Sequence, residues 1–337
     1  MQPSAPPPAI IAALRRMRLL GANDPDPAGR VLTGGVSSDI WLVDLPGGPV
    51  CVKRALPHLK VAADWQAPVE RNRYEARWMR RANAAVPGSA PALCGEDAES
   101  GTLAMQYLPP ESYPLWKPRL HQGCTDAAFA ALVGYNLVRI HAATAADRTV
   151  APEFPTDAIF HAIRIEPYLL ATAARHPDHA AALRALAEET VATRRALVHG
   201  DVSPKNILCG ADGPVFLDAE CAWWGDPAFD LAFCLNHLLL KCLWVPRATA
   251  GLLACYAALA GAYLPGVAWE APATLEGRAA RLLGGLLLAR VDGKSPVEYI
   301  TVEQDKDRVR RVARALLARP PARLDDVAAA WRREVER

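Results

Sequence analysis

The chain of 337 residues lacks an excess of charge of either sign, because 38 Lys and Arg residues stand against 36 Asp and Glu residues. A formal net charge of +2 gives no reason to expect nucleic acid or an acidic membrane as the partner. The basic stretches 71–81 and 306–319 alternate with apolar residues at helical spacing and contain no interleaved aromatics. We therefore interpret them as solvated helix faces.

Cysteine pairs and long apolar runs are also missing. The eight cysteines form no CxxC pair, and most lie in apolar runs, where a free thiol behaves as a small hydrophobe. The apolar stretch Leu282–Val291 is too short to cross a bilayer, and no other run qualifies in our interpretation. With no signal-peptide pattern, these features predict a soluble, cytoplasmic protein.

Several motifs that define enzyme classes are absent too. The sequence has neither GxGxxG nor GxxxxGK[ST], and no zinc, Ser-His-Asp or Cys-His pattern. The 29 prolines are scattered, so they indicate turns and helix starts rather than a disordered tract. A chain of this length and composition is expected to form two domains or lobes.

The first third of the chain is rich in β signals. The runs Ile40–Leu45 and Val50–Ala55 surround a Gly-Gly turn and predict a hairpin. A helix is expected over 69–84, with strands near 91–95 and 102–107 and an N-terminal helix over 9–20. The sequence Leu108-Pro109-Pro110 then breaks the chain, and we place a lobe boundary there.

Beyond this boundary the pattern becomes helical. Eight Ala- and Leu-rich segments show helical periodicity: 127–146, 158–174, 179–195, 228–243, 249–263, 275–291, 303–318 and 324–335. The only β signals in this half flank Asn206 and Asp218. We therefore predict an α+β protein with a small β-rich lobe over 1–108 and a larger, mainly helical lobe over 109–337.

The stretch from Leu197 to Glu220 contains the most specific pattern. Asp201 and Asn206 lie five residues apart on one predicted loop, and Asp218 follows twelve residues later on the next predicted strand. Phosphoryl transfer from a Mg-nucleotide uses such a set, with one carboxylate at the acceptor hydroxyl and an amide and a second carboxylate at the metal. Asp201 is the candidate catalytic base, and Asn206 and Asp218 are candidate magnesium ligands.

Neighbouring polar residues have two possible roles each. Glu220 is expected on the same strand face as Asp218, where it binds metal or a metal-bound water, or else is a solvated or capping carboxylate. His199 is more plausible as a loop-bracing hydrogen bonder than as a proton shuttle. Lys205 reaches the transferring phosphate or is solvated. Asp230 is expected to bond the backbone of the catalytic loop.

The nucleotide half of the predicted site comes from the first lobe. Lys53 lies mid-strand in an apolar run, where an ammonium needs a partner, and Glu75 of the following helix is favoured over Glu70. The alternative is an outward-facing lysine on an edge strand. The turn with Gly34, Gly35, Ser37 and Ser38 is the candidate phosphate loop, and the backbone from Gln106 to Leu108 is the candidate adenine contact.

Two tryptophans follow the metal-binding stretch. Trp223 and Trp224 either form the wall of a substrate pocket or pack inside the protein. Asp226 just before Pro227 is a plausible helix cap.

The segments 199–206, 217–220 and 225–230 resemble the aminoglycoside phosphotransferase and choline kinase superfamily. Within it, Val52–His58, Trp65 and Glu75–Arg77 are most similar to the methylthioribose kinases. The resemblance implies a protein-kinase-like fold and the use of ATP and Mg²⁺. It also implies Asp201 as the base, the Asp218-Ala219-Glu220 sequence as a metal-linked Asp-x-Glu, and Lys53 at the nucleotide.

The resemblance is weaker in the segments expected to contact the acceptor. Methylthioribose kinases have a paired arginine late in the chain, whereas 280–284 contains only Arg281. A polar insertion at 289–296 includes Arg290, and these two arginines are our candidates for contact with the substrate.

The predicted function is an ATP- and Mg-dependent phosphotransferase acting on a hydroxyl of a small polar metabolite, such as a methylthioribose-like sugar or an amino alcohol. The alternatives are an aminoglycoside O-phosphotransferase and a catalytically inactive nucleotide-binding regulator on the same fold. The sequence leaves open whether the protein is a monomer or a homodimer.

Overall fold

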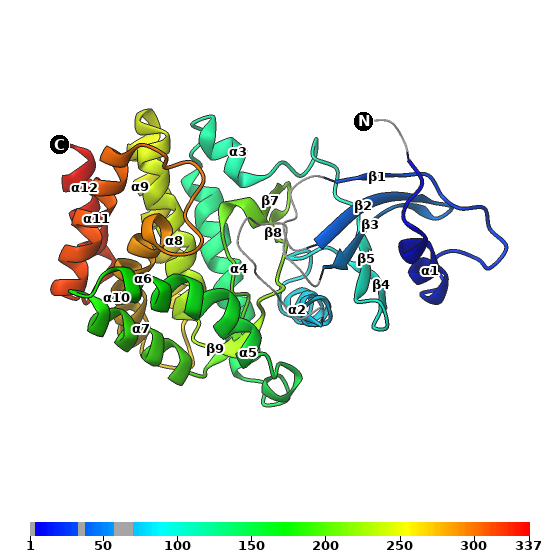
Figure 1. The fold of residues 1–337 in the computed structure, drawn as a ribbon, viewed down its shortest axis with the longest axis horizontal. Helices are drawn as coiled ribbons and strands as arrows, with labels where there is room; N and C mark the ends of the chain where they lie inside the picture. Colours follow the sequence, from blue (N-terminus) through cyan, green and yellow to red (C-terminus); the bar gives the residue numbers. More distant parts are fainter. Residues whose placement is uncertain (1–3, 33–37, 57–69) are drawn as a thin grey trace.

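Alternating apolar residues near the N-terminus form one antiparallel sheet in the order β1-β2-β3-β5-β4 (Figure 1). The structure is a computed structural model and describes residues 4–32, 38–56 and 70–337. The strands of this sheet are β1 (Gly29–Val31), β2 (Ser38–Leu45), β3 (Gly48–Ala55), β4 (Leu93–Asp97) and β5 (Thr102–Gln106). The predicted hairpin is confirmed as β2 and β3, which turn at Gly48 with a φ of +112°.

Two helices accompany the sheet. Helix α1 (Pro8–Arg16) packs Ile10 and Leu14 against the buried sheet residues Trp41 and Val43. Helix α2 (Arg71–Ala85) confirms the helix expected over 69–84 and lies between the sheet and the larger lobe (Figure 1). Helix α1 ends before the predicted Leu20, because Arg18 adopts a left-handed conformation with a φ of 60°.

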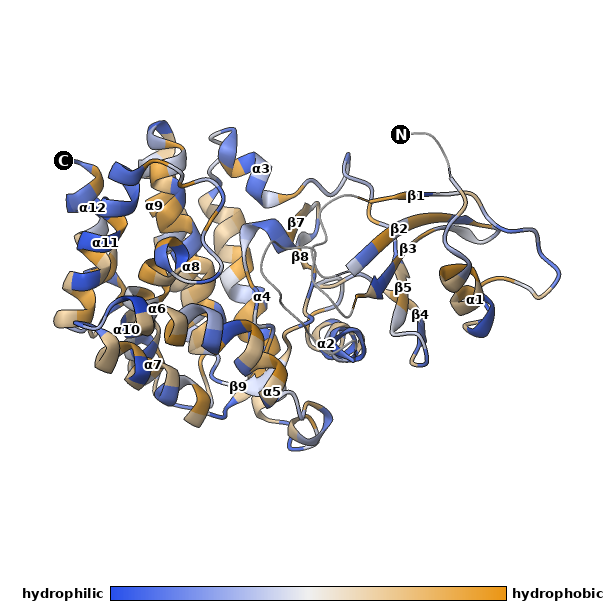
Figure 2. Ribbon diagram, viewed as in Figure 1, coloured by the Kyte–Doolittle hydropathy of each residue, from blue (hydrophilic) through white to orange (hydrophobic). Residues whose placement is uncertain are grey.

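The rest of the described chain is mainly helical (Figure 1). Its helices are α3 (Trp116–His121), α4 (Ala127–Ala145), α5 (Asp157–Phe160), α6 (Ala171–Arg175), α7 (Ala180–Ala192), α8 (Ala228–Trp244), α9 (Thr249–Tyr263), α10 (Pro272–Asp292), α11 (Glu303–Ala318) and α12 (Leu324–Val335). Apolar and polar residues alternate along them, as periodicity predicts (Figure 2). The short helix α3 is missing from the sequence prediction.

The prediction of one regular helix over 158–174 is wrong. The segment consists of α5, a π-helix over His161–Leu170 (η2) and α6. Pro167 lies inside the π-helix, where it has no N–H to donate and its ring crowds the preceding turn. A π-helical stretch within an α-helix is rare and often occurs at a functional site.

Short strands frame the central loop of the large lobe. Strands β7 (Ile207–Gly210) and β8 (Gly213–Phe216) pair with each other, and β6 (Ala196–Val198) pairs with β9 (Trp223–Gly225). The sequence prediction missed β6 and β9. It also placed Asp218 and Glu220 on one strand, which is wrong because β8 ends at Phe216.

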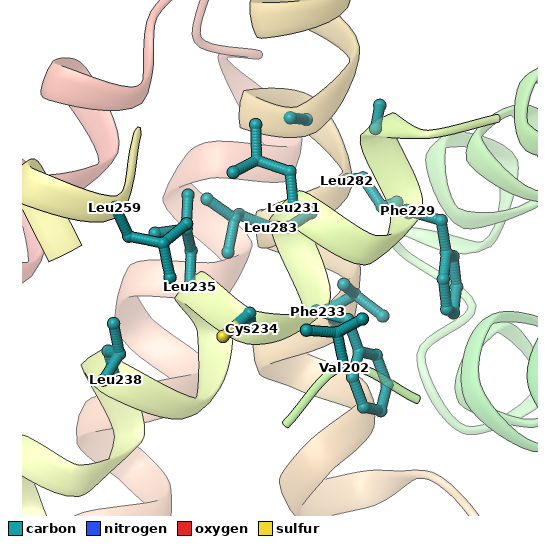
Figure 3. Packing of buried hydrophobic residues seen from close by; sticks show 14 of the residues in the cluster. Val202, Phe229, Leu231, Phe233, Cys234, Leu235, Leu238, Leu259, Leu282 and Leu283 are labelled. Atoms are coloured by element: carbon teal, nitrogen blue, oxygen red, sulfur yellow. The ribbon is translucent and has the colours of Figure 1, made fainter. Parts of the chain in front are cut away.

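Helix α8 forms the centre of the large lobe. Every residue from Ala228 to Leu243 is buried. Figure 3 shows its apolar side chains, such as Phe229, Leu231 and Leu235, among residues of α9, α10 and the 202 region. The same helix also buries polar groups, including Asp230, His237 and Lys241, in the part of the molecule nearest the central loop and α3.

One segment, Pro246–Gly266, is long and apolar enough to cross a membrane by composition alone. Our expectation that no run qualifies is therefore wrong. The segment contains α9, which packs extensively on α4 and α8, and core helices of soluble proteins meet the same criterion. It is weak evidence for a membrane span.

Candidate active site

The loop after β6 is held by backbone bonds to one buried carboxylate. Asp230, in the first turn of α8, accepts from His199 N at 2.7 Å and from Gly200 N at 2.8 Å. Gly200 has a φ of +80°, which glycine adopts without a steric penalty. The expected role of Asp230 is confirmed, and its hydrogen bonds fix the backbone of the two residues that precede Asp201.

His199 braces the same loop from the other side. Its Nδ1 accepts from Asp201 N at 3.1 Å, so its Nε2 carries the proton and donates to Leu217 O at 3.0 Å. Burial lowers the pKa of His199, which keeps the ring neutral in this arrangement. His199 therefore connects Asp201 to the segment before Asp218, as expected of a bracing residue.

A further histidine, His141 of α4, supports Asp230 and was not found from the sequence. Its Nε2 lies 3.2 Å from Asp230 Oδ2, and its Nδ1 lies 2.7 Å from Tyr263 Oη. With Nε2 donating to the carboxylate, Nδ1 accepts from the tyrosine hydroxyl. A histidine inside an apolar helix was the only signal available.

Asp201 is buried, with 5% of its surface exposed, and two cations face its Oδ2. Arg164 Nη2 lies at 3.0 Å and Lys205 Nζ at 3.2 Å. Burial alone would raise the pKa of Asp201, but the charges of Lys205 and Arg164 outweigh it and lower the pKa. Asp201 is therefore an ionised acceptor suited to orienting a hydroxyl.

Arg164 is the most important site residue that sequence reasoning missed. It comes from the π-helix, donates Nε to Gly200 O, and lies 5.7 Å from the ring centroids of both Tyr168 and Phe233. The π-helix thus presents an arginine to the loop that bears Asp201. Pro167 within an otherwise helical pattern was the available sequence signal.

Asn206 and Asp218 have the chemistry of magnesium ligands. Asn206 donates Nδ2 to Asp201 O at 3.1 Å, and its Oδ1 accepts no hydrogen bond within the described part of the chain. Asp218 has a φ of +66°, a conformation that Asp tolerates better than most residues and that is common at functional sites. Two protein oxygens are sufficient for Mg²⁺, which takes its remaining ligands from phosphates and water.

Lys53 of β3 links Asp218 to the small lobe. Its Nζ donates to Glu75 Oε2 at 2.7 Å and also to Asp218 Oδ1, and the lysine is only 3% exposed. Burial opposes its charge, but Asp218 and Glu75 outweigh that effect and raise the pKa of Lys53 well above its ordinary value. The predicted ion pair with Glu75 is present.

Glu220 is held by a buried arginine of α2. It lies beyond the end of β8 and accepts from Arg71 Nε at 2.9 Å, while Arg71 Nη2 donates to Leu56 O at 2.8 Å. The ion pair engages Oε2 of Glu220, and a role of this carboxylate at the metal stays a prediction. Arg71 is fully buried, so the interpretation of residues 71–81 as a solvated face is wrong for this arginine.

The remaining nucleotide candidates are only partly described. Gly34, Gly35 and Ser37 lie outside the described residues, as does Trp65. Ser38 begins β2 opposite Ala55, and its buried Oγ has no partner among the described residues.

The segment after β5 offers free backbone groups. Gln106 ends β5 and donates its N–H to Ala92 O at 2.8 Å. Leu108 makes no backbone hydrogen bond to another described residue, so its peptide groups are available to a ligand.

Three of the four substrate candidates lie in other environments. Trp223 stacks on Phe160 at 4.2 Å, and its Nε1 donates to Asp157 at 2.6 Å. Arg281 pairs with Glu189 at 2.6 Å on the side of α10 that faces α7. Trp224 is half-buried on β9, and none of these three contacts Asp201 within the described structure.

Arg290, the fourth candidate, lies in a different place. It is buried, and its Nη1 donates to Tyr168 Oη at 3.1 Å. The Tyr168 ring also contacts Arg164, so Arg290 is one side chain away from the arginine on Asp201.

Comparison with known proteins identifies the family of this chain. The model of the phosphotransferase enzyme family matches residues 28–268, so the chain belongs to that family. Its fold is protein-kinase-like, with a small antiparallel-sheet lobe and a larger helical lobe.

Individual relatives are distant. Methylthioribose kinase 2 of Oryza sativa subsp. japonica is 23% identical over 60% of this chain, and the match spans 53% of the relative's own length. A choline/ethanolamine kinase family protein from Mesorhizobium loti is similar in structure, with a TM-score of 0.55, 18% identity and coverage of 96% of this chain and 97% of its own. An amicoumacin kinase in complex with AMP-PNP, Ca²⁺ and Ami has a TM-score of 0.55 and 13% identity, and the match covers 93% of this chain and 94% of that one.

Proposed function

We propose that this protein transfers a phosphoryl group from Mg·ATP to a hydroxyl of a small polar metabolite. The observation that carries the proposal is the position of Lys53 Nζ, which bonds both Glu75 of α2 and Asp218 of the large lobe. Asp201 and Asn206 lie on the loop that His199 connects to the Asp218 segment. The proposed base, the proposed metal ligands and the lysine are therefore held in one connected set, which supports the proposal.

Each residue has a separate task in this proposal. Asp201 orients the acceptor hydroxyl and takes its proton late in the transfer, since its lowered pKa makes it a weak base. Asn206 and Asp218 hold Mg²⁺, which would neutralise charge on the phosphate oxygens when bound. Lys53 supports the nucleotide phosphates, and the free peptide groups at Leu108 face the adenine edge.

We further propose that residues 1–108 form the nucleotide-binding lobe and that residues 109–337 form the catalytic and substrate-binding lobe. We also place the protein in the cytoplasm, in keeping with eight free cysteines, five of which are buried.

Two substitutions separate the roles of the carboxylates. Asp201→Asn should lower acceptor-dependent ADP formation by about 100-fold or more, because a correctly placed base contributes at least this much. The thermal shift produced by Mg·AMP-PNP should persist in this variant. Asp218→Asn should instead abolish that shift, because the metal loses its carboxylate.

A matched control is Asp212→Asn, since Asp212 lies exposed in the turn between β7 and β8. This variant should turn over and bind nucleotide like the unaltered protein. Full turnover by Asp201→Asn, or an unchanged nucleotide shift in Asp218→Asn, would contradict the proposal and favour a different site or a regulatory protein.

A further inference from the structure

A group of basic side chains that the proposed chemistry does not use lies around the C-terminal half of α8. We call Lys117, His237, Lys241 and Arg290, together with the rings of Trp244 and Tyr299, the basic cluster. Its members come from α3, α8, α10 and the loop after α10. Arg290 and Tyr299 lie beyond residue 268, where the match to the family model ends.

Lys241 lies at the centre of the basic cluster. It is 1% exposed, and its Nζ lies 4.3 Å from the ring centroid of Tyr299 and 5.2 Å from that of Trp244. Within the described part of the chain, its ammonium has no hydrogen bond or ion pair. A buried ammonium without an acceptor is costly, which indicates that an acceptor from outside the chain belongs here.

Lys117 approaches the same two rings from α3. Its Nζ lies 5.9 Å from the Tyr299 centroid and 6.0 Å from that of Trp244. It pairs with Glu298, whose side chain is 65% exposed and therefore easily exchanged for another anion. Lys117 is partly exposed, as are Trp244 and Tyr299.

Two buried side-chain nitrogens of the basic cluster also have no partner. His237 Nδ1 lies 3.3 Å from Tyr299 Oη, and in the tautomer in which Nδ1 accepts from this hydroxyl, Nε2–H is a donor. Neither this Nε2 nor Arg290 Nε has a hydrogen-bond partner among the described residues, although both are buried. Unpartnered buried nitrogens beside the unpaired ammonium of Lys241 favour an acceptor group with negative charge.

Packed side chains connect the basic cluster to Asp201. Arg164 contacts Asp201 and lies 5.7 Å from the Phe233 ring, which in turn lies 5.3 Å from the ring of His237. Arg290 reaches the same arginine through Tyr168. The basic cluster is therefore linked to Asp201 through Arg164 and the aromatic side chains packed on it.

We propose that the basic cluster binds an anionic group, a carboxylate or a phosphate monoester, on the acceptor whose hydroxyl faces Asp201. This inference rests on the proposed function. A cationic acceptor such as an aminoglycoside or an amino alcohol would meet like charges. The two aromatic rings that could bind an ammonium already face Lys117 and Lys241.

The electrostatics of the cluster agree with its geometry. Burial and the neighbouring charge of Lys117 lower the pKa of Lys241 to about 7. Burial, followed by the charges of Arg290 and Lys241, lowers the pKa of His237 well below its ordinary value. A bound anion would offset this repulsion and raise both pKa values.

The test compares binding of small probes by thermal shift, with the nucleotide site saturated by Mg·AMP-PNP. The probes are inorganic phosphate, glycerate, glycerol 3-phosphate, glycerol and choline. We expect at least one anionic probe to raise the melting temperature at millimolar concentration, and glycerol and choline to leave it unchanged. Glycerate and glycerol 3-phosphate distinguish a carboxylate site from a phosphate site.

The variant Lys241→Met keeps the apolar stem and should abolish the shift caused by the anion. Its own melting temperature should be equal or higher, because a desolvated charge is removed. The matched control is Lys294→Met, since Lys294 is exposed and pairs with Glu166 on the nearby surface. It should respond to the anions like the unaltered protein.

For any acceptor that turns over, Lys241→Met should raise the KM for the anionic acceptor by about 10- to 100-fold, the value of a charge-assisted hydrogen bond. Its effect on kcat should be smaller, and the KM for ATP should not change.

An absent anion shift, a shift that persists in Lys241→Met, or preferred binding of choline would overturn the inference. Anion binding through Lys241 without any Asp201-dependent phosphorylation would instead overturn the proposed function and leave the anion site standing. Asp201-dependent phosphorylation of neutral or cationic acceptors that Lys241→Met does not affect would overturn the anion site and leave the proposed function standing.

Discussion

Two residues with left-handed backbone conformations flank the proposed chemistry. Gly200 precedes Asp201 with a φ of +80°, and Asp218 itself has a φ of +66°. A Cβ on Gly200 would lie 2.7 Å from the carbonyl oxygen of Cys221, which is closer than real contacts allow. Because Asp230 also holds the Gly200 N–H, neither the backbone nor its neighbour can move freely.

We therefore expect Gly200→Ala to destabilise the fold by about 2 kcal/mol and to lower turnover by at least about tenfold. The cause is displacement of the loop that bears Asp201. Urea unfolding and ADP formation measure the two effects.

Gly47→Ala is the control, because a Cβ at Gly47 would meet nothing within 4 Å. Equal stabilities of the two variants would show that the conformation at Gly200 is not needed.

At the scale of single residues, the sequence predicts those functional residues whose partners lie close to them in the chain. His199, Asp201 and Asn206 lie on one loop, so their spacing is enough to propose their roles. Arg164 lies 37 positions before Asp201 and reaches it only through the irregular π-helix. No periodic pattern could have placed that guanidinium, because a regular helix would turn its side chains by a different angle.

At the scale of elements, the first turn of α8 organises the catalytic loop. Asp230 accepts from His199 N, Gly200 N and His141 Nε2, and it is fully buried. The N-terminus of a helix is also a favourable place for a carboxylate. One side chain of α8 thus fixes a loop that lies thirty residues earlier in the chain.

The substitution Asp230→Ala should destabilise the protein by about 3 kcal/mol, because three buried donors lose their acceptor. Remaining folded protein should show a larger loss in kcat than in the KM for ATP, since the loop with Asp201 is displaced while Lys53 is untouched. Urea unfolding and steady-state kinetics test this.

Asp230→Asn is the conservative comparison. Its carbonyl oxygen can still accept from the loop, so part of the stability and turnover should return. Loss of stability without any change in kcat would show that Asp230 only supports the core.

Long elements were predictable from periodicity and short ones were not. Helices α9, α11 and α12 have the predicted bounds, because each buries one regular stripe of apolar residues. Strands β6 and β9 have three residues each, too few to display a period of two. The boundary of β8 was also misplaced, since Leu217 and Asp218 look like strand residues until the backbone of Asp218 turns.

For the whole molecule, a buried carboxylate at the end of α10 joins three helices. Asp292 accepts from Arg310 of α11 at 2.9 and 2.8 Å and contacts His176, next to α6, at 2.9 Å. Burial would raise the pKa of Asp292, but the hydrogen bonds from Arg310 outweigh it and lower the pKa. A carboxylate whose pKa is lower in the folded state stabilises the fold above its unfolded pKa.

We expect Asp292→Asn to lower the free energy of unfolding by about 2 kcal/mol at pH 7. The difference from the unaltered protein should stay constant down to about pH 5 and shrink below about pH 4, as the carboxylate becomes protonated. Urea unfolding at several pH values measures it.

The exposed substitution Asp212→Asn provides the baseline for this series. A difference between Asp292→Asn and the unaltered protein that grows as the pH falls would contradict the assignment.

The contacts of helix α2 hold the two lobes together independently of the chain that joins them. It pairs with Lys53 through Glu75 in the small lobe, and Arg71 and Arg81 pair with Glu220 and Asp147 in the large lobe. A main-chain bond from Phe216 N to Ser89 O adds to these contacts just beyond the helix. A protease cut at the proposed lobe boundary, Leu108–Pro110, would therefore yield two fragments that stay bound to each other, because the chain itself is only one of the connections between them.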